Sequence, residues 1–354
     1  MKNETSLYLD LVRFISALVV FLGHAAGKLT GGFLWQLNDY LSAAVMMFFV
    51  LSGYVIAFVY DNKEKTFISF SFSRISRFYS VAVPALLLTA LCDYIGIKIN
   101  YDLYFGGPWP APQNDFLNYL LSFFFIQNVW GIDLNPGINT PFWSLTFEFG
   151  FYFLFAFFVF FKGLPRFFLL LILSVFLGPD VLGYLPIWLI GFLIYFLHKR
   201  IQYLNTKVSL LFFIFTSLLL LIATPSVYSL ISGKPDFMIA NRNVYADYVI
   251  CIVFAANLFF SNYCSVITSV LLRFKLLITF AAGCSFTLYL FHRPLIQLFA
   301  AFEFGEPTSV ANRFAVIGGT LLVVYTFGYW CESQRYVLKR WLYTLLNRSQ
   351  ILKS

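Results

Sequence analysis

The sequence predicts an all-α fold, a polytopic membrane bundle of ten transmembrane helices with one short re-entrant or interfacial segment. Of its 354 residues, 60% are hydrophobic and only 11% are charged, whereas a soluble domain carries about 25% charged residues. Several apolar runs are long enough to cross a bilayer, and short basic connections separate many of them. Together these features exclude a soluble globular protein.

Eleven apolar runs are candidate membrane spans, because a helix needs about 20 apolar residues to cross the hydrocarbon core. They lie near residues 7–27, 40–60, 79–99, 116–130, 142–161, 166–182, 184–198, 208–224, 244–261, 277–300 and 313–332. Eleven crossings would leave the two termini on opposite sides of the membrane.

The basic connections favour a different arrangement. Lysine and arginine accumulate in cytoplasmic connections, and both the connection at 61–78 and the C-terminal tail are basic. We therefore expect both termini in the cytoplasm, which requires an even number of crossings. Segment 116–130 is the shortest run between 79 and 142 and follows a stretch rich in proline. We expect this segment to be re-entrant or interfacial, which leaves ten crossings.

We assign residues 1–334 to one membrane domain and residues 335–354 to a basic cytoplasmic tail. The longest polar connections, near 100–115 and 225–243, are too short to fold alone. The basic residues do not gather on a soluble face, so we expect no nucleic-acid partner. The five cysteines lie in or beside apolar runs without a CxxC motif, and we infer neither a disulfide nor a metal site from them.

Three polar side chains interrupt the first apolar run, LDLVRFISALVVFLGHAAG at residues 9–27. Asp10 precedes Arg13 by three positions, so the two can pair on one helix face. Arg13 and His24 are eleven residues apart, which is about three turns and roughly 16 Å. With the N-terminus inside, Arg13 lies near the cytoplasm and His24 in the outer half of the membrane. A structural ion pair and a hydrogen-bonded histidine are the alternative, but ionisable groups within membranes are functional by default.

A glutamate lies within the aromatic run TPFWSLTFEFGFYF, residues 140–153. Ser144 and Glu148 are four residues apart and share a helix face. This helix is expected to enter from outside, which places Glu148 in the outer half of the membrane at a depth close to that of His24. The alternative is an interfacial aromatic belt that includes Trp143, with Glu148 turned toward water.

Two further motifs carry candidate site residues. SFTLYLFHRPLI, residues 285–296, places His292 in the outer half of its helix, where a hydrogen-bonded interfacial histidine is an equal alternative. SFSRISRFY, residues 71–79, places Arg74 and Arg77 at the cytoplasmic mouth. Paired arginines suit phosphate recognition because guanidinium donors fit phosphate oxygens in bidentate geometry. Topology alone also explains basic residues at this place.

These motifs resemble those of the acyltransferase-3 family of membrane O-acyltransferases. The arginine and histidine of the first helix, FFVLSGYVI (48–56), SRISR (73–77), PFWSLTFEFGFY (141–152) and SFTLYLFHRP (285–294) follow one another in the order that the family shows. The resemblance covers nearly the whole chain and is to the stand-alone members, which lack an extracytoplasmic esterase-like domain. It implies ten helices, acyl-CoA as the cytoplasmic donor, and transfer, usually of acetyl, to a sugar hydroxyl of a surface or secreted glycan. It also implies that Arg13 and His24 are both needed.

From this resemblance we expect an O-acetyltransferase of the cell inner membrane that moves acetyl from acetyl-CoA to a surface or lipid-linked glycan without a metal. Arg13, Arg74 and Arg77 would hold the phosphates of CoA. His24 would either deprotonate the acceptor hydroxyl or carry the acyl group itself. Glu148 would orient the imidazole or stabilise its cation. Further site candidates are Asp10, Trp143, Ser144 and His292.

Other interpretations stay open at this stage. A member of the same family could use succinyl-CoA, or could modify a small hydrophobic molecule such as a macrolide. A glycan flippase or secondary transporter belongs to a different class, but transporters often show inverted repeats with broken helices, and we find no internal repeat. A purely structural subunit leaves the polar face of the first helix without an explanation. The acceptor hydroxyl, the acyl group and the oligomeric state also stay open.

Overall fold

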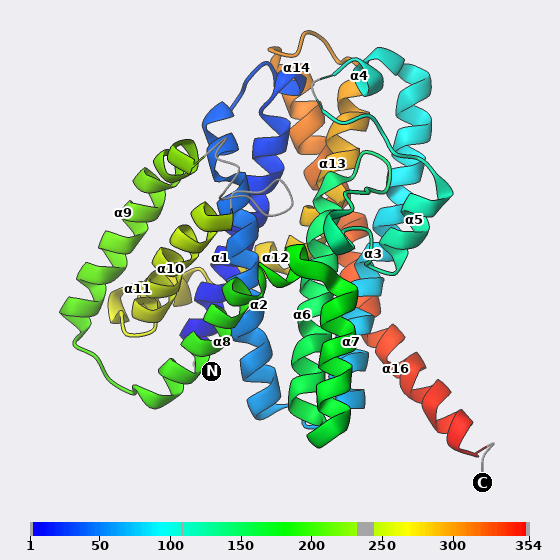
Figure 1. Cartoon of the computed structure of the whole chain (residues 1–354). Coiled ribbons are helices and arrows are strands. Elements are labelled where there is room, and N and C mark those ends of the chain that lie inside the picture. Colours follow the sequence, from blue (N-terminus) through cyan, green and yellow to red (C-terminus); the bar gives the residue numbers. More distant parts are fainter. Residues whose placement is uncertain (1–2, 108, 232–243, 352–354) are drawn as a thin grey trace. The chain divides into compact units, whose positions relative to one another are not determined.

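The computed structural model describes residues 3–107, 109–231 and 244–351, and these residues are almost entirely helical. Within these ranges there is no strand, and one isolated bridge joins Gln113 to Gly137. The all-α fold predicted from the sequence is therefore confirmed. The chain forms two compact units, whose helices are shown in Figure 1. Unit 1 comprises Met1–His24, Leu34–Lys63 and Leu177–Ser285, and unit 2 comprises Ala25–Phe33, Glu64–Phe176 and Phe286–Ser354.

Eight helices in the described part of the chain are long and apolar enough to cross a membrane. A further candidate is the pair of α11 (Ser265–Arg273) and α12 (Lys275–Gly283), which are bent by 75° at their junction. Helices α8 (Leu185–Arg200) and α13 (Ser285–Ala301) have 16 and 17 residues, or about 24 and 26 Å, slightly less than the hydrocarbon core of about 30 Å. The polytopic helical bundle is thus confirmed, while the number of ten crossings stays a prediction.

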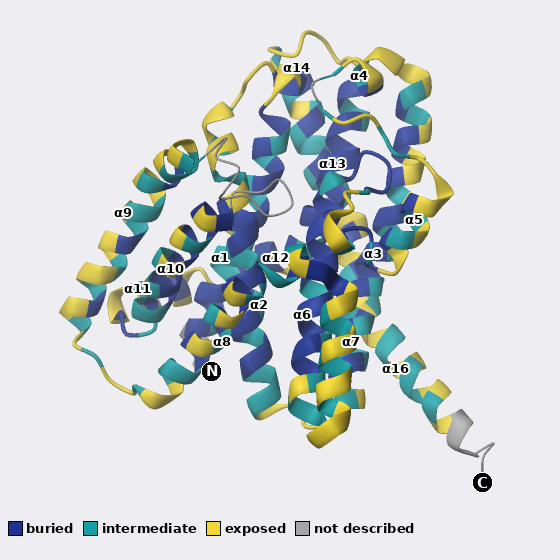
Figure 2. Cartoon of the chain, in the orientation of Figure 1, coloured by how far each residue is buried: buried dark blue, intermediate teal, exposed yellow. Residues whose placement is uncertain are grey.

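Unit 1 is built on α1 (Asn3–Ala25), η2 (Trp35–Tyr40), α2 (Leu41–Asn62), α8, α9 (Thr206–Ile231), α10 (Val244–Ser261) and the α11–α12 pair. Helix α2 packs against α8, and α10 packs against α2, α8 and α9. Figure 2 shows many exposed positions along α9, and large apolar side chains such as Leu211, Phe215 and Ile222 occupy them. An exposed apolar face of this extent fits contact with lipid.

Glycines let α2 and α8 approach each other backbone to backbone. A Cβ atom added at Gly53 would lie 1.9 Å from the carbonyl oxygen of Trp188, and one added at Gly191 would lie 1.8 Å from that of Val50. Any side chain at either position therefore forces the two helices apart. Small residues are common at helix crossings in membranes, where van der Waals packing rather than the hydrophobic effect holds helices together. The glycine of the motif FFVLSGYVI thus has a structural role.

A buried carboxylate ties several elements of unit 1 together. Asp247, on α10, accepts hydrogen bonds from Ser42 Oγ at 2.9 Å, from Tyr184 Oη at 3.2 Å and from Tyr228 Oη at 2.6 Å. These donors come from α2, from the residue before α8 and from α9. A buried acid needs such partners because an unsatisfied polar group in a low-dielectric interior costs free energy. The position of Asp247 is therefore explained by packing alone.

Unit 2 is built on α3 (Phe67–Ile99), α4 (Tyr101–Phe105), α5 (Phe116–Phe123), α6 (Trp143–Phe160), the first part of α7 (Gly163–Leu182), α13, α14 (Val310–Arg313), α15 (Gly319–Val323) and α16 (Tyr329–Ile351). Its short turns are η1 (Lys28–Thr30), η3 (Val129–Gly131) and η4 (Thr140–Phe142). The π-helical segments η6 (Phe314–Gly318) and η7 (Val324–Gly328) join α14 to α16 in one long candidate span. Helix continues to Ile351, so no change of secondary structure marks residue 335, and our boundary between membrane domain and tail stays a prediction.

Helix α3 begins earlier than expected. It runs from Phe67 to Ile99, whereas we predicted a loop at 61–78 and a span that starts at 79. The ring of Phe67 stacks on that of Phe157 near the end of α6, with centroids 5.9 Å apart. The polar motif SFSRISRFY is therefore part of a membrane helix. Acids within unit 2 compensate the charges of its arginines. Glu64 pairs with Arg74, and Glu148 and Glu332 interact with Arg77.

The predicted span at 277–300 is interrupted. Helix α12 ends at Gly283 in unit 1, and α13 begins at Ser285 and continues in unit 2. Glycine is a weak helix former, which favours the break. A residue of another helix, α16, stabilises the start of α13. The amide nitrogen of Thr287 donates to Glu332 Oε1 at 3.3 Å, which satisfies one of the amide groups that a helix start leaves without a partner.

Helix α5 is too short to cross the membrane. Its eight residues give about 12 Å at 1.5 Å per residue, against a core of about 30 Å. The chain then returns to the start of α6, where Gln127 Nε2 donates to the carbonyl oxygen of Phe142 at 2.8 Å. These findings agree with the re-entrant or interfacial segment expected at 116–130.

Contacts within unit 2 identify the segments at the end where α3 finishes. Asn100 Nδ2 donates to Glu303 Oε1 at 2.5 Å. Asn312 Nδ2 donates to the carbonyl oxygen of Leu29 at 2.8 Å. The segments 25–33, 100–107 and 302–313 therefore share one end of the unit.

We expect Gly53→Ala to destabilise the protein, because the added Cβ meets the backbone of α8 rather than a movable side chain. Overpacking a close-packed interior costs about 1–3 kcal/mol. Thermal unfolding of the purified protein in detergent measures the effect. The matched control is Gly283→Ala, since a Cβ there meets nothing within 4 Å. Equal unfolding midpoints for the two variants would contradict the close crossing of α2 and α8.

Single cysteines can test the path of the chain through unit 2. Lys28, Lys65 and Asp133 are exposed. With the native cysteines replaced, we expect Lys28→Cys and Asp133→Cys to react with a membrane-impermeant thiol reagent on intact cells, because 116–130 does not cross. We expect Lys65→Cys to react only after permeabilisation. If Asp133→Cys needs permeabilisation while Lys28→Cys does not, segment 116–130 crosses the membrane.

Candidate active site

The polar face of α1 has the geometry expected from the sequence. The helix is continuous from Asn3 to Ala25, so Arg13 and His24 project from one face about 16 Å apart along its axis. Arg13 Nη1 lies 3.1 Å from Asp10 Oδ1, which confirms the predicted pair. His24 occupies the last turn of the helix. Unit 1 thus carries an ion pair and an imidazole at two levels of one helix.

Arg74 forms a buried ion pair that the sequence did not indicate. Its Nη2 lies 2.6 Å from Glu64 Oε2, and both residues are buried. The guanidinium carbon lies 5.0 Å from the ring centroid of Phe70 and 5.8 Å from that of Tyr152. The Nε atom is buried without a hydrogen-bond partner. Arg74 is therefore partly committed to Glu64 and keeps one donor unused.

We predicted Arg77 in a cytoplasmic connection, but it lies within helix α3. It is ten residues, or about 15 Å, from the start of α3. Its charge interacts with Glu148, Glu332 and Tyr152, and Tyr152 Oη donates to Glu148 Oε1. The guanidinium also lies over the ring of Phe286, with a carbon-to-centroid distance of 5.9 Å. Arg77 and Glu148 therefore lie at one level of unit 2, although the sequence had suggested opposite halves of the membrane.

Sequence reasoning missed Glu332. This residue is on α16, and its Oε1 accepts hydrogen bonds from the amide and the hydroxyl of Thr287, both at 3.3 Å. It therefore caps α13 and balances the charge of Arg77 at the same time. A signal was available, since Glu332 is an acid at the end of the apolar run that we placed at 313–332.

A second polar cluster in unit 2 contains three other predicted residues. Tyr289 Oη donates to Ser144 Oγ at 2.9 Å and also lies 3.1 Å from the carbonyl oxygen of Pro141. The ring of Tyr289 contacts His292, with centroids 6.3 Å apart. His292 is fully buried, and its Nδ1 lies 3.0 Å from the carbonyl oxygen of Leu288. Because a carbonyl only accepts, Nδ1 carries the proton. Trp143 is buried too, so it does not belong to an exposed aromatic belt.

The structure thus divides the predicted site residues between the two units. Asp10, Arg13 and His24 belong to unit 1, and Arg74, Arg77, Trp143, Ser144, Glu148 and His292 belong to unit 2. Within unit 2, Arg77 is brought together with Glu148, and Ser144 is linked to His292 through Tyr289. The expected pairing of His24 with Glu148 stays a prediction. Among the described residues, no group of three or more histidine, cysteine or acidic side chains has the arrangement of a metal site.

A family model described as an acyltransferase domain matches residues 6–329. The chain belongs to the acyltransferase-3 family. It is therefore a membrane acyltransferase. The match includes α1 with Arg13 and His24, and it ends before Glu332. No curated protein and no solved structure matches the chain.

We expect Arg77→Met to destabilise the acyltransferase, because it removes the cation whose charge interacts with Glu148 and Glu332. Breaking a fully buried charge pair costs about 3–5 kcal/mol, and the partial exposure of Arg77 and Glu332 reduces this to about 2 kcal/mol. A second change, Glu332→Gln, should restore part of the loss, since the amide is neutral and still accepts from Thr287.

Unfolding of the wild type, both single variants and the double variant measures the coupling between the two positions. Lys98→Met is the matched control, because Lys98 is an exposed cation on the same helix. Strictly additive effects of Arg77→Met and Glu332→Gln would show that these side chains do not interact.

Proposed function

We propose that this acyltransferase moves an acetyl group from cytoplasmic acetyl-CoA to a hydroxyl of a surface or lipid-linked glycan. The observation that carries the proposal is the polar face of α1 in a chain of this family. One continuous helix presents a cation at Arg13 and an imidazole at His24. Inside a membrane such ionisable groups cost free energy and usually have a function. The enzyme is proposed to lie in the cell inner membrane with both termini in the cytoplasm.

The spacing on α1 fits the shape of the donor. The arm of CoA between its diphosphate and its sulfur has about twelve bonds. At roughly 3.3–3.6 Å for every three bonds, as in an extended peptide, it spans about 14 Å. The distance along α1 from Arg13 to His24 is about 16 Å. A diphosphate held by Arg13 would therefore present its thioester near His24.

The reaction needs a base because a sugar hydroxyl is a poor nucleophile. In direct transfer, a nitrogen of His24 takes the hydroxyl proton while the oxygen forms a bond to the thioester carbonyl carbon. The carbon–sulfur bond then breaks, and the imidazolium returns the proton to the thiolate of CoA. In the alternative route, His24 itself attacks the thioester, CoA leaves as the thiol, and the hydroxyl takes the acyl group from the imidazole in a second step.

Residues of unit 2 have supporting roles in this proposal. Arg74 is buried and paired with Glu64, so in this proposal a contact to the donor phosphates competes with that ion pair. Arg77 is balanced by Glu148 and Glu332, which favours a structural contribution alongside any contact to the donor. Glu148 accepts from Tyr152 and is thus held in one orientation.

We expect His24→Ala to abolish acyl transfer at normal protein level and membrane insertion. A general base alone contributes roughly 10²–10⁴-fold, and loss of an acyl carrier would be more severe. The assay follows radioactive acetyl from acetyl-CoA into the glycan fraction of membrane vesicles. The control is His198→Gln, which removes an imidazole of unit 1 that is bonded to Tyr54 Oη and the carbonyl oxygen of Phe259. Its activity should stay within about threefold of wild type, in keeping with a packing role. Full activity of His24→Ala would remove this histidine from the mechanism.

A further inference from the structure

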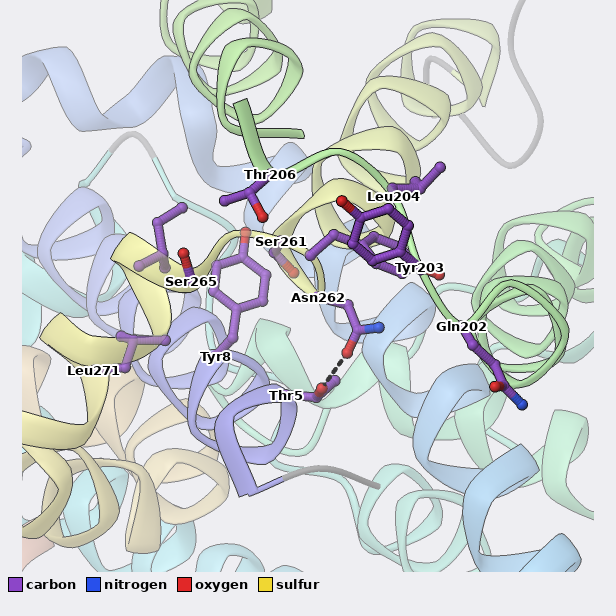
Figure 3. A pocket seen from close by; sticks show the side chains of 12 residues that line it. Thr5, Tyr8, Gln202, Tyr203, Leu204, Thr206, Ser261, Asn262, Ser265 and Leu271 are labelled. Atoms are coloured by element: carbon purple, nitrogen blue, oxygen red, sulfur yellow. Dashed lines mark hydrogen bonds between the residues drawn. The ribbon is translucent and has the colours of Figure 1, made fainter. Parts of the chain in front are cut away.

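A cavity of about 390 Å³ lies in unit 1 at the start of α1. It is bounded by the connection from α8 to α9 and by the connection from α10 to α11 (Figure 3). Its lining includes Thr5, Tyr203, Asn262, Tyr263 and Ser265. This size is within the range of small-molecule sites, about 300–1,000 Å³.

The lining is polar but uncharged. Most of the residues that form it carry a hydroxyl or an amide. Some of these groups hold the wall in place: Thr5 Oγ1 donates to Asn262 Oδ1 at 2.6 Å, and Tyr263 Oη donates to the carbonyl oxygen of Ile201 at 2.6 Å. Burial raises the pKa of Tyr263, so its phenol stays neutral. Such a surface suits a neutral ligand that both donates and accepts hydrogen bonds.

An aromatic ring stands at the edge of this cavity. The side chain of Tyr203 is 79% exposed although it lines the cavity, so most of its ring surface is uncovered. An exposed ring of this kind is a platform for a planar base, and stacking of this type is strong for every nucleobase. The ring therefore favours a nucleobase over an aliphatic ligand.

Three cations flank lining residues of the cavity in the sequence. Arg200 precedes Gln202 by two positions, Lys207 directly follows Thr206, and Arg273 follows Leu271 by two. All three cations are exposed. A neutral lining with exposed cations on the flanking segments suits a nucleoside whose phosphates point outward, because lysine and arginine provide charge-assisted donors to phosphate.

We propose that this cavity binds the nucleotide end of CoA, with the adenine against Tyr203, the ribose among the hydroxyls and the 3′-phosphate near the flanking cations. This inference rests on the proposed function, since it takes acyl-CoA as the donor. It also extends that function along α1: Thr5 is eight residues before Arg13, which is about 12 Å along the axis and about 80° around it. The nucleotide, the diphosphate and the thioester would then follow one another along one helix.

Equilibrium binding tests the proposal directly. The full-length protein in nanodiscs is titrated with CoA and, separately, with adenosine 3′,5′-bisphosphate, which is the nucleotide end alone. Ser265→Trp fills the cavity from an exposed position at the start of α11, and Tyr203→Ala removes the ring. We expect both variants to bind both ligands at least tenfold more weakly. The matched control is Ser226→Trp, an exposed serine twenty residues further along α9 than Thr206, which should bind as the wild type does.

The unfolding midpoints of the variants and acetyl transfer to the glycan separate the possible outcomes. Unfolding midpoints close to wild type show that the variants are folded, and Tyr203→Ala, which introduces no bulk, guards against distortion by tryptophan. Unchanged affinity of both variants for both ligands overturns the nucleotide site, as does a wild type that binds neither ligand. If binding depends on the cavity but no acetyl reaches the glycan, the nucleotide site stands and the proposed function fails.

Discussion

Inside a membrane, water cannot satisfy a polar group, so each one must find its partner within the protein. This constraint explains most of the polar contacts described above. Glu64 neutralises Arg74, and Glu148 and Glu332 balance Arg77. Three hydroxyls surround Asp247. Helices that would otherwise pack only through small residues and aromatic rings are thereby fixed in register.

The same constraint explains what could be predicted from the sequence and what could not. Apolar run length is a local property, so most helices and the short α5 were predictable. The position of Arg77 was not, because its partner Glu332 lies more than 250 positions away along the chain. The basic motif around Arg77 predicts a loop, whereas in the folded unit Arg77 lies within α3 and Glu148 and Glu332 supply its counter-charge. The break at Gly283 was missed for a similar reason, since the cap on α13 comes from another helix.

In the candidate site too, local features could be predicted from the sequence and contacts between distant segments could not. The alignment of Arg13 with His24 depends only on the period of one helix, and the structure has that alignment. The link from Ser144 through Tyr289 toward His292 depends on the packing of two helices that are far apart in sequence, and nothing in either motif indicates it. The cavity beside Tyr203 likewise draws its lining from segments separated by about 190 positions, so no single motif contains it.

The chain passes back and forth between the two units, after His24, Phe33, Lys63, Phe176 and Ser285. As the ribosome releases the chain, neither unit can be completed from one continuous stretch. Unit 1 is complete only when residues up to 285 have been synthesised. The segment 25–33 of unit 2 is held in place by residues beyond 302, which are synthesised later still. The first helices must therefore enter the membrane before the segments that finally pack against them have been synthesised. Assembly of this enzyme is consequently a late event in its synthesis, and splitting the chain at a unit boundary would separate segments that belong to the same unit.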